Sequence, residues 1–147
     1  IAFFSSQPEP AAGTIAAKLQ PLVDVGLSYI KLGQSSSTLS GGESQRIKLA
    51  YFLSMTDSTA KKMMFIFDEP TTGLHFHDVE KLVKAFDSLL DRGHTVVVVE
   101  HNLDVIRSAD WLIELGPGAG DRGGSLVFAG TPEELARKKD TATSAYL

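Results

Sequence analysis

The sequence predicts an α/β fold whose sheet is largely parallel and flanked by helices. The run 63–67 is short, apolar and aromatic-rich, which is typical of a strand buried on both faces of a parallel sheet. The run 95–99, with four valines, indicates a second such strand. Between them, apolar residues recur at helical spacing over 79–90, and Gly93 stands where a glycine commonly follows a helix end. Strand, helix and strand in this order favour parallel pairing.

The N-terminal third is predicted to contain two helices. Proline and glycine in residues 5–14 predict an irregular lead-in. Apolar spacing predicts a helix over 15–25, which Pro21 is expected to kink or split. Ser40 and Glu43 have the spacing of a capping box, so a second helix is expected to begin at Ser40.

The C-terminal third is predicted to form a hairpin between two helices. It contains, in order, a short helix, a strand, a glycine-rich loop, another strand and a capped helix: 103–108, 111–115, 116–124, 126–129 and a helix beginning after Thr131. A loop of nine residues is too short for a crossover helix, so the two strands should be antiparallel, at the edge of the sheet. The polar tail from Asp140 is expected to be loosely ordered.

Composition limits the classes of protein that fit. The 147 residues are about one domain, and 43% hydrophobic content suffices for a core. A net charge of −4 gives no global attraction to nucleic acid or anionic membranes. The chain has no cysteine, which excludes disulfides and cysteine-ligated zinc within it. No apolar run has the length needed to span a bilayer, so no membrane partner and a cytoplasmic location are expected.

Two adjacent acids, Asp68 and Glu69, end the first predicted strand. Ligands of open α/β sheets bind at the carboxyl ends of the strands. One carboxylate there can hold a hard cation, and the other can orient or deprotonate a water molecule. The alternative is a polar turn that only ends the strand, because Asp-Glu-Pro alone would serve that purpose.

Two further features suit phosphate chemistry. Gly41 and Gly42 occupy the first turn of the helix that begins at Ser40, where each costs about 1 kcal/mol relative to alanine. They are explained if an anion approaches the backbone at the helix start, and the alternative is a merely flexible start. His101 follows the second strand and should share a sheet edge with the acids; alternatively, it caps the next helix.

Other patterns are set aside. The glycines at 118, 120 and 123 match a dinucleotide-binding spacing, but they lead into a strand instead of opening a helix. His75 and His77 lie near a helix start without a convincing third metal ligand. The chain also lacks the G-x-S-x-G pattern of serine hydrolases.

Taken in order, the motifs resemble the ATP-binding-cassette (ABC) ATPases, which have the P-loop NTPase fold. The set is Leu39-Ser-Gly-Gly-Glu43, a strand ending in Asp-Glu-Pro, the turn 71–75 and a strand followed by His101. The likeness narrows to the C-terminal cassette of the UvrA family, the damage-recognition ATPases of bacterial nucleotide excision repair. The segments that carry this narrower likeness are 29–34, 39–43, 71–76, 100–106, 109–111 and 115–117.

The resemblance implies roles for three residues around a bound ATP. Asp68 resembles the Walker B aspartate, which holds Mg²⁺, usually through water. Glu69 resembles the general base that orients the attacking water. His101 resembles the switch histidine that contacts the γ-phosphate. These roles suit phosphoryl transfer, which asks a protein mainly for positioning and charge stabilisation.

The resemblance implies a second set of residues at the interface between cassettes. The signature motif binds the γ-phosphate of an ATP held by a different cassette, and the D-loop crosses the interface between cassettes. The signature corresponds to Ser40, Gly41, Gly42 and Glu43, and the D-loop to Gly73 and Leu74.

The chain also departs from the family pattern. No G-x-x-x-x-G-K-[ST] occurs, so the Walker A part of the fold is missing, and the cysteines that bind zinc in the family are expected only in a region upstream. We therefore expect residues 1–147 to be the C-terminal portion of one ABC ATPase domain, with 1–38 leading into the signature and 39–147 carrying the other motifs. As an isolated fragment it is expected to be inactive.

The resemblance implies that a longer parent protein uses ATP and Mg²⁺. It implies as partners a second cassette of the same protein, a second copy in a homodimer, DNA and a UvrB-like helicase. One alternative is a cassette of another ABC ATPase, but Glu43 and the Thr-Gly-Leu-His turn at 72–75 count against a transporter-type motif set. The other is a module that only mediates interactions.

Overall fold

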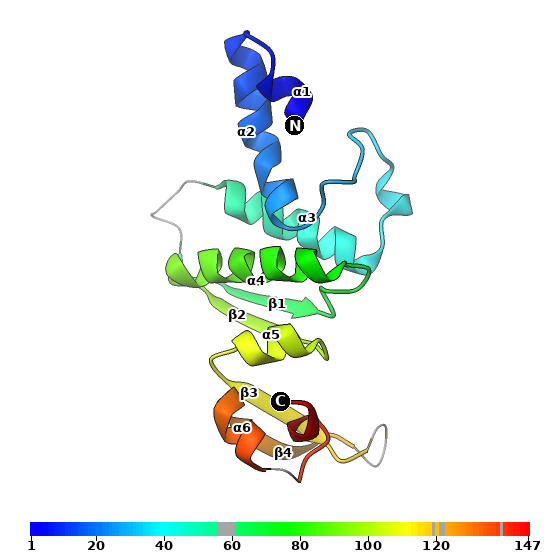
Figure 1. Ribbon diagram of the computed structural model, residues 1–147, viewed down its shortest axis with the longest axis vertical. Helices are drawn as coiled ribbons and strands as arrows, with labels where there is room; N and C mark the ends of the chain where they lie inside the picture. Colours follow the sequence, from blue (N-terminus) through cyan, green and yellow to red (C-terminus); the bar gives the residue numbers. More distant parts are fainter. Residues whose placement is uncertain (56–60, 119, 121–122, 139) are drawn as a thin grey trace. The chain divides into compact units, whose positions relative to one another are not determined.

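The computed structural model (Figure 1) describes residues 1–55, 61–118, 120, 123–138 and 140–147. The chain divides into two compact units, Ile1–Glu100 and His101–Leu147. The first unit contains α1 (Ala2–Ser5), α2 (Pro10–Asp24), η1 (Ser36–Thr38), α3 (Gly41–Ser54), β1 (Met64–Asp68), α4 (Phe76–Asp91) and β2 (Thr95–Val99). The second contains α5 (Leu103–Ser108), β3 (Leu112–Gly116), β4 (Ser125–Gly130), α6 (Pro132–Lys138) and η3 (Ser144–Tyr146).

Strands β1 and β2 pair in parallel, as predicted. Their register runs from Met64 opposite Thr95 to Asp68 opposite Val99. Helix α4 makes the crossover and ends at Asp91, and Gly93 follows the cap residue Arg92 with φ of +80°. That left-handed conformation is one that glycine adopts without strain, so Gly93 closes the helix as the sequence indicates. Both strands consequently end at the same edge of the sheet.

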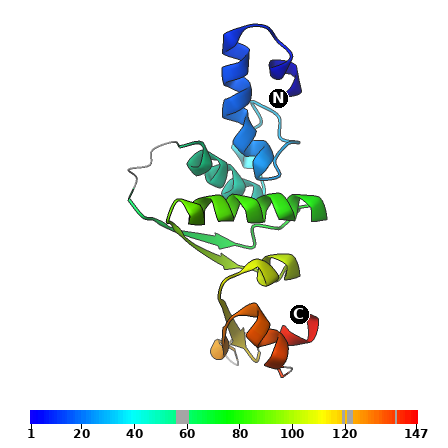
Figure 2. The ribbon, with the colours of Figure 1, turned by 60° about the vertical axis from the view of Figure 1, so that its left-hand side comes forward.

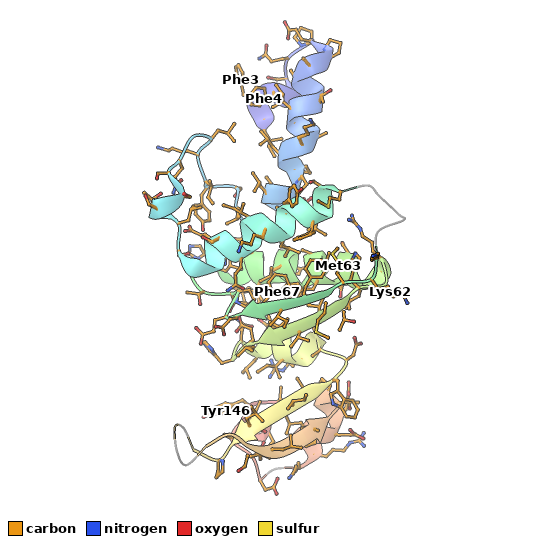
Figure 3. The ribbon with its side chains drawn as sticks, turned by 180° about the vertical axis from the view of Figure 1, so that it is seen from behind. Phe3, Phe4, Lys62, Met63, Phe67 and Tyr146 are labelled. Atoms are coloured by element: carbon orange, nitrogen blue, oxygen red, sulfur yellow. The ribbon has the colours of Figure 1, made fainter. Side chains whose placement is uncertain are left out.

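The core of the first unit lies between the parallel strands and the helices. Helices α3 and α4 lie on the same side of the strands in both ribbon views, and α2 packs against α3 (Figures 1 and 2). Phe67 of β1 faces these helices (Figure 3), and its ring centroid lies 4.9 Å from that of Phe86 on α4. The buried core residues are Val25, Leu27, Leu49, Ala50, Phe67, Leu82, Ala85, Phe86 and Leu89.

The prediction that the first strand is buried on both faces is wrong for the unit Ile1–Glu100. Side chains alternate along β1, so Phe67 is buried, whereas Met64 and Ile66 are 64% and 69% exposed. Val97 and Val99 of β2 are likewise exposed. The cause is that the helices of this unit pack on one face of a two-stranded sheet. The unbroken apolar run therefore has only alternate residues in the core.

The N-terminal lead-in is more helical than predicted. Helix α2 begins at Pro10, inside the stretch predicted to be irregular, because proline fits the first helical turn, where its missing N–H would have no helical partner. The helix also continues through Pro21 to Asp24, so the predicted split is wrong. The carbonyl of Pro21 still accepts from Val25 N at 3.2 Å, which closes the last turn.

The second unit contains the predicted antiparallel hairpin. Strands β3 and β4 pair from Leu112 opposite Gly130 to Gly116 opposite Ser125, with an irregularity after Glu114. They form their own two-stranded sheet, so the prediction that the hairpin lies at the edge of the parallel sheet is wrong for the described residues. Residues 119, 121 and 122 of the predicted glycine-rich loop, like 56–60 before β1, lie outside the described residues.

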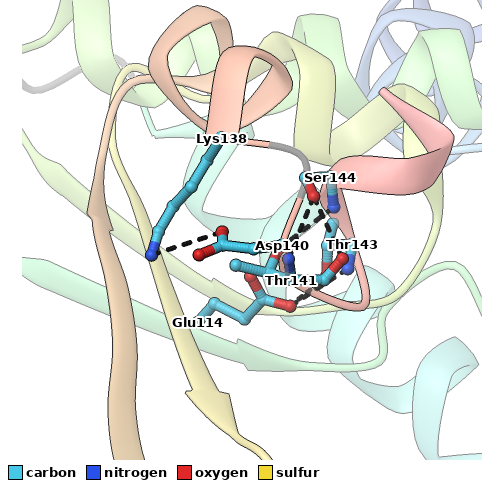
Figure 4. A network of polar contacts seen from close by, with 6 residues as sticks. All are labelled: Glu114, Lys138, Asp140, Thr141, Thr143 and Ser144. Atoms are coloured by element: carbon cyan, nitrogen blue, oxygen red, sulfur yellow. Dashed lines mark hydrogen bonds and ion pairs between the residues drawn. The ribbon is translucent and has the colours of Figure 1, made fainter.

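The polar tail is ordered by hydrogen bonds, contrary to the prediction. The Glu114 carboxylate accepts from Thr143 N at 3.1 Å and from Thr143 Oγ1 at 2.8 Å (Figure 4). Thr141 and Ser144 are buried and hydrogen-bond to each other. Burial acts to raise the pKa of Glu114, but the hydrogen bonds from Thr141 and Thr143 outweigh it, and the pKa is lowered. The carboxylate of Glu114 thus helps to dock the polar tail.

Candidate functional site

The start of α3 has the predicted capping box. Ser40 is extended, with φ of −69° and ψ of 165°, and its hydroxyl accepts from Glu43 N at 3.2 Å. In return, the Glu43 carboxylate accepts from Ser40 N at 2.7 Å. These reciprocal bonds satisfy two backbone donors at the helix start and fix its position. We call residues 40–43 the signature start.

Glu43 has a second partner that the sequence did not reveal. The Tyr29 hydroxyl donates to Glu43 Oε1 at 2.7 Å. This hydrogen bond, followed by the one from Ser40 N, lowers the pKa of Glu43. Burial, followed by the hydrogen bond to Glu43, raises the pKa of Tyr29. The loop that contains Tyr29 is thereby tied to the signature start.

Replacing Tyr29 with phenylalanine is expected to raise the pKa of Glu43, because the largest cause of its lowering is removed. Since the native pKa lies below the unfolded value of about 4.3, the carboxylate stabilises the fold fully above that pH. This contribution is lost as the pH falls through the native pKa. A side-chain NMR titration measures the change. Glu80 is the control, because its pKa is lowered by Lys84 and should stay constant; an unchanged Glu43 pKa would contradict the assignment.

The two glycines of the signature start differ in their surroundings. A Cβ on Gly42 would lie 3.1 Å from Arg46 Nη1 and 3.2 Å from the Thr72 carbonyl oxygen, so the fold itself favours glycine there. A Cβ on Gly41 would meet nothing within 4 Å, and its φ lies outside the left-handed range. Within the described residues, the fold gives no reason for glycine at position 41.

The two predicted acids stand at the end of β1, in a turn we call the acidic turn (68–72). Glu69 N donates to Val99 O at 2.9 Å, and Thr72 N donates to Glu69 O at 3.1 Å. Glu69 has a φ of +45° and is, among the described residues, the one non-glycine residue with positive φ. Such a conformation costs about 1–3 kcal/mol and persists where surrounding contacts fix it, which is common at functional sites.

Helix α3 holds the acidic turn through two side chains. Gln45 forms a pair of hydrogen bonds with the backbone of Asp68: Nε2 donates to Asp68 O at 2.8 Å, and Oε1 accepts from Asp68 N at 3.1 Å. Arg46 Nη1 donates to Pro70 O at 2.5 Å and to Thr72 O at 3.2 Å. Neither residue belongs to a site predicted from the sequence. The burial of Arg46 could have been predicted from the helical spacing, because Arg46 lies on the same face of α3 as the buried Leu49.

A third side chain reaches the acidic turn from Glu100, the residue that follows β2. Glu100 Oε1 accepts from Thr71 N at 2.8 Å and from Thr71 Oγ1 at 2.5 Å. The turn is thus bonded to α3 on one side and to the end of β2 on the other. The signature start and the acidic turn are far apart in sequence. Helix α3, which begins at the signature start, holds the two together through Gln45 and Arg46.

The predicted D-loop residues continue this turn. Gly73 has a φ of +77°, which requires glycine or strain, and no atom lies within 4 Å of its Cβ position. Leu74 is half-buried and packs against the core of its own unit.

The comparisons with known proteins agree with these motifs. The chain is 57% identical over 141 residues to UvrABC system protein A of Xanthomonas axonopodis pv. citri, which covers 96% of the chain, and 54% identical over 145 residues to that of Clostridium perfringens, which covers 99%. The crystal structure of UvrA2 from Deinococcus radiodurans superposes with a TM-score of 0.83 and 41% identity over 92% of the chain.

The chain belongs to the UvrA family. It spans 14–15% of the length of those two curated relatives and 16% of the UvrA2 chain. An archaeal ribosome recycling factor, solved with a ribosomal stalk protein, shares the fold at a TM-score of 0.60 and 24% identity, over 80% of the chain and 22% of its own. No family model matches the chain.

Within this UvrA-family chain, His101 belongs to the second compact unit, whereas the acids belong to the first. It precedes Asn102, whose side chain caps α5 by accepting from Asp104 N and Val105 N. The capping role weighed for His101 is therefore filled by its neighbour. Its role toward a phosphate stays a prediction.

Metal-binding groups in the described part of this UvrA-family chain are sparse. No three histidine, aspartate or glutamate side chains converge there on a point that could hold a metal ion. The exposed Asp68 is still suited to Mg²⁺, which typically retains waters and takes only one or two protein carboxylates beside substrate phosphates. No helix in the described ranges has the length and apolar character needed to cross a membrane.

Proposed function

We propose that this chain supplies the signature, Walker B and D-loop elements of one cassette in an ATPase of nucleotide excision repair. The observation that carries the proposal is the fixed pairing of the signature start with the acidic turn through Gln45 and Arg46. Two elements that serve phosphate chemistry are thereby rigidly positioned. The likeness to UvrABC system protein A over 96% of the chain supports the assignment.

The acidic turn would serve the ATP bound to its own cassette. Asp68 would hold Mg²⁺, usually through water, and the metal would neutralise charge on the phosphates. Glu69, fixed in a left-handed conformation, would orient the attacking water and accept its proton. His101 would contact the γ-phosphate. These 147 residues contain no Walker A pattern, so the loop that cradles the phosphates would come from other residues.

The signature start would serve an ATP held by the other cassette. Its first-turn N–H groups and the partial positive charge of a helix start favour a phosphate, and Gly41 leaves the approach open. Ser40, Gly42 and Glu43 complete this element. Gly73 and Leu74 would lie at the cassette interface.

The biological setting follows from the family. We infer a cytoplasmic parent protein that pairs two cassettes, forms a homodimer, binds DNA and hands damaged DNA to a UvrB-like helicase. The curated relatives carry the name of the UvrABC system, which supports this setting. Zinc would belong to residues outside this cysteine-free chain.

MgATP titration tests the proposal. The 147-residue chain is compared with a chimera in which it replaces the matching residues of the Xanthomonas axonopodis UvrABC system protein A. The other cassette of the chimera carries the glutamate-to-glutamine exchange equivalent to Glu69→Gln, so that turnover comes from this cassette. We expect the chain alone to bind no MgATP up to millimolar concentrations, and the chimera to hydrolyse it at rates within about threefold of the relative with the same exchange, since more than half of the replaced residues are identical. Turnover by the isolated chain, or a folded chimera without turnover, would overturn the proposal.

A further inference from the structure

Arg46 is a buried cation that donates hydrogen bonds to backbone carbonyls. It has no exposed surface, and its Nη1 donates to the oxygens of Pro70 and Thr72. Its Nε and Nη2 have no hydrogen-bond partner in the described part of the chain, and its charge also acts on the Glu43 carboxylate and the Tyr29 hydroxyl at the signature start. Burying an arginine with two of its nitrogens unsatisfied is an expensive way to pack a helix. The position therefore requires a reason beyond packing.

Gln45 provides an independent observation beside it. Its amide bonds to both the N–H and the carbonyl of Asp68, in the manner of a neighbouring strand. Together, Gln45 and Arg46 contact alternate backbone positions of the acidic turn, namely 68, 70 and 72. Glu69 lies between these contacts, in a conformation that it would not hold unaided.

We propose that Gln45 and Arg46 are positioning residues that set the orientation of the Glu69 carboxylate by holding the backbone on both sides of it. They touch neither phosphate nor metal in this role; they act on the turn that carries Asp68 and Glu69. The inference rests on the proposed ATPase function and adds to it the source of the turn's rigidity. It also places the signature start and the acidic turn on one rigid body, so a displacement of the first moves the second.

Two conservative substitutions test the proposal in the chimera. Gln45→Glu retains the size and the acceptor for Asp68 N but loses the donor to Asp68 O. Arg46→Lys retains the charge but loses the planar guanidinium that fixes the direction of the two hydrogen bonds from Nη1. Each is expected to lower kcat at least tenfold, because a misplacement of about 1 Å in a catalytic group can cost 100-fold. MgATP affinity and the number of ATP molecules bound per chimera should stay within about threefold.

Matched controls separate positioning from stability. Arg92 also donates to backbone carbonyls of α3, those of Phe52, Leu53 and Met55, but at the opposite end of the helix. Gln20 bonds to Asp24 on the surface of α2. Arg92→Lys and Gln20→Glu should leave kcat within about twofold, whatever they do to the melting temperature.

The outcomes distinguish this inference from the function on which it rests. If Gln45→Glu and Arg46→Lys lower kcat only in proportion to the fraction of folded, ATP-binding protein, as Arg92→Lys would, the two residues are structural and the inference fails. If both variants retain full kcat while Glu69→Gln abolishes turnover, the inference fails and the function stands. If Glu69→Gln has no effect either, the proposed function fails with it.

Discussion

Replacing Glu69 with glutamine is expected to lower ATP turnover at this site by about 100-fold or more, because general-base catalysis contributes roughly that much. Glutamine has the same shape and can keep the Thr72 N–H bonded to the residue 69 carbonyl, but it cannot accept a proton from water. MgATP affinity should stay within about threefold, since the phosphates would be held by other residues. Turnover and nucleotide affinity are measured in the chimera with the Xanthomonas relative.

The site must be isolated for this measurement, because the proposed parent protein has two cassettes. The chimera therefore carries the equivalent glutamate-to-glutamine exchange in its other cassette, so that the remaining turnover comes from this one. Glu80→Gln on α4 is the control, as Glu80 is an exposed partner of Lys84 away from the acidic turn. Unchanged turnover in the Glu69→Gln variant would show that another group activates the water.

Local patterns predicted the local structure of this chain. The spacing of Ser40 and Glu43 predicted the capping box, and both reciprocal bonds are present. The amphipathic stretch before Gly93 predicted α4 and its end. The runs that became β1 and β2 predicted a parallel pair. Each of these depends on residues within one or two turns, or on the rule that a crossover helix joins parallel strands.

Long-range polar contacts could not be predicted in the same way. The bond from Tyr29 to Glu43 and those from Gln45 to Asp68 join residues 14 and 23 positions apart, and no periodicity encodes them. The prediction of a loosely ordered C-terminal tail failed for the same reason. Glu114 orders the tail through hydrogen bonds that composition does not reveal. Burial on one face of β1 depends on how many layers of helix cover the sheet, which the apolar run alone does not specify.

Exchanging each glycine of the signature start for alanine is expected to separate a functional from a structural requirement. Gly41→Ala should leave the fold as stable as before or up to about 1 kcal/mol more stable, because its Cβ meets nothing and alanine favours helix. Turnover should nevertheless fall at least tenfold in a second chimera, which carries Glu69→Gln and keeps the glutamate of the other cassette, because the methyl group lies where a phosphate of that other cassette would approach the backbone.

Gly42→Ala should instead destabilise the protein by about 1–3 kcal/mol, the usual cost of forcing a methyl group into packed structure. Its Cβ would press on the Thr72 carbonyl and on Arg46, so the acidic turn would shift as well. Gly13→Ala on α2 is the matched control: it has the same open surroundings as Gly41, and turnover should not change. Denaturant unfolding and turnover are measured on the same variants of the chimera. If Gly41→Ala retained full turnover, the open space at that glycine would have no bearing on phosphate, and the signature assignment would lose its physical basis.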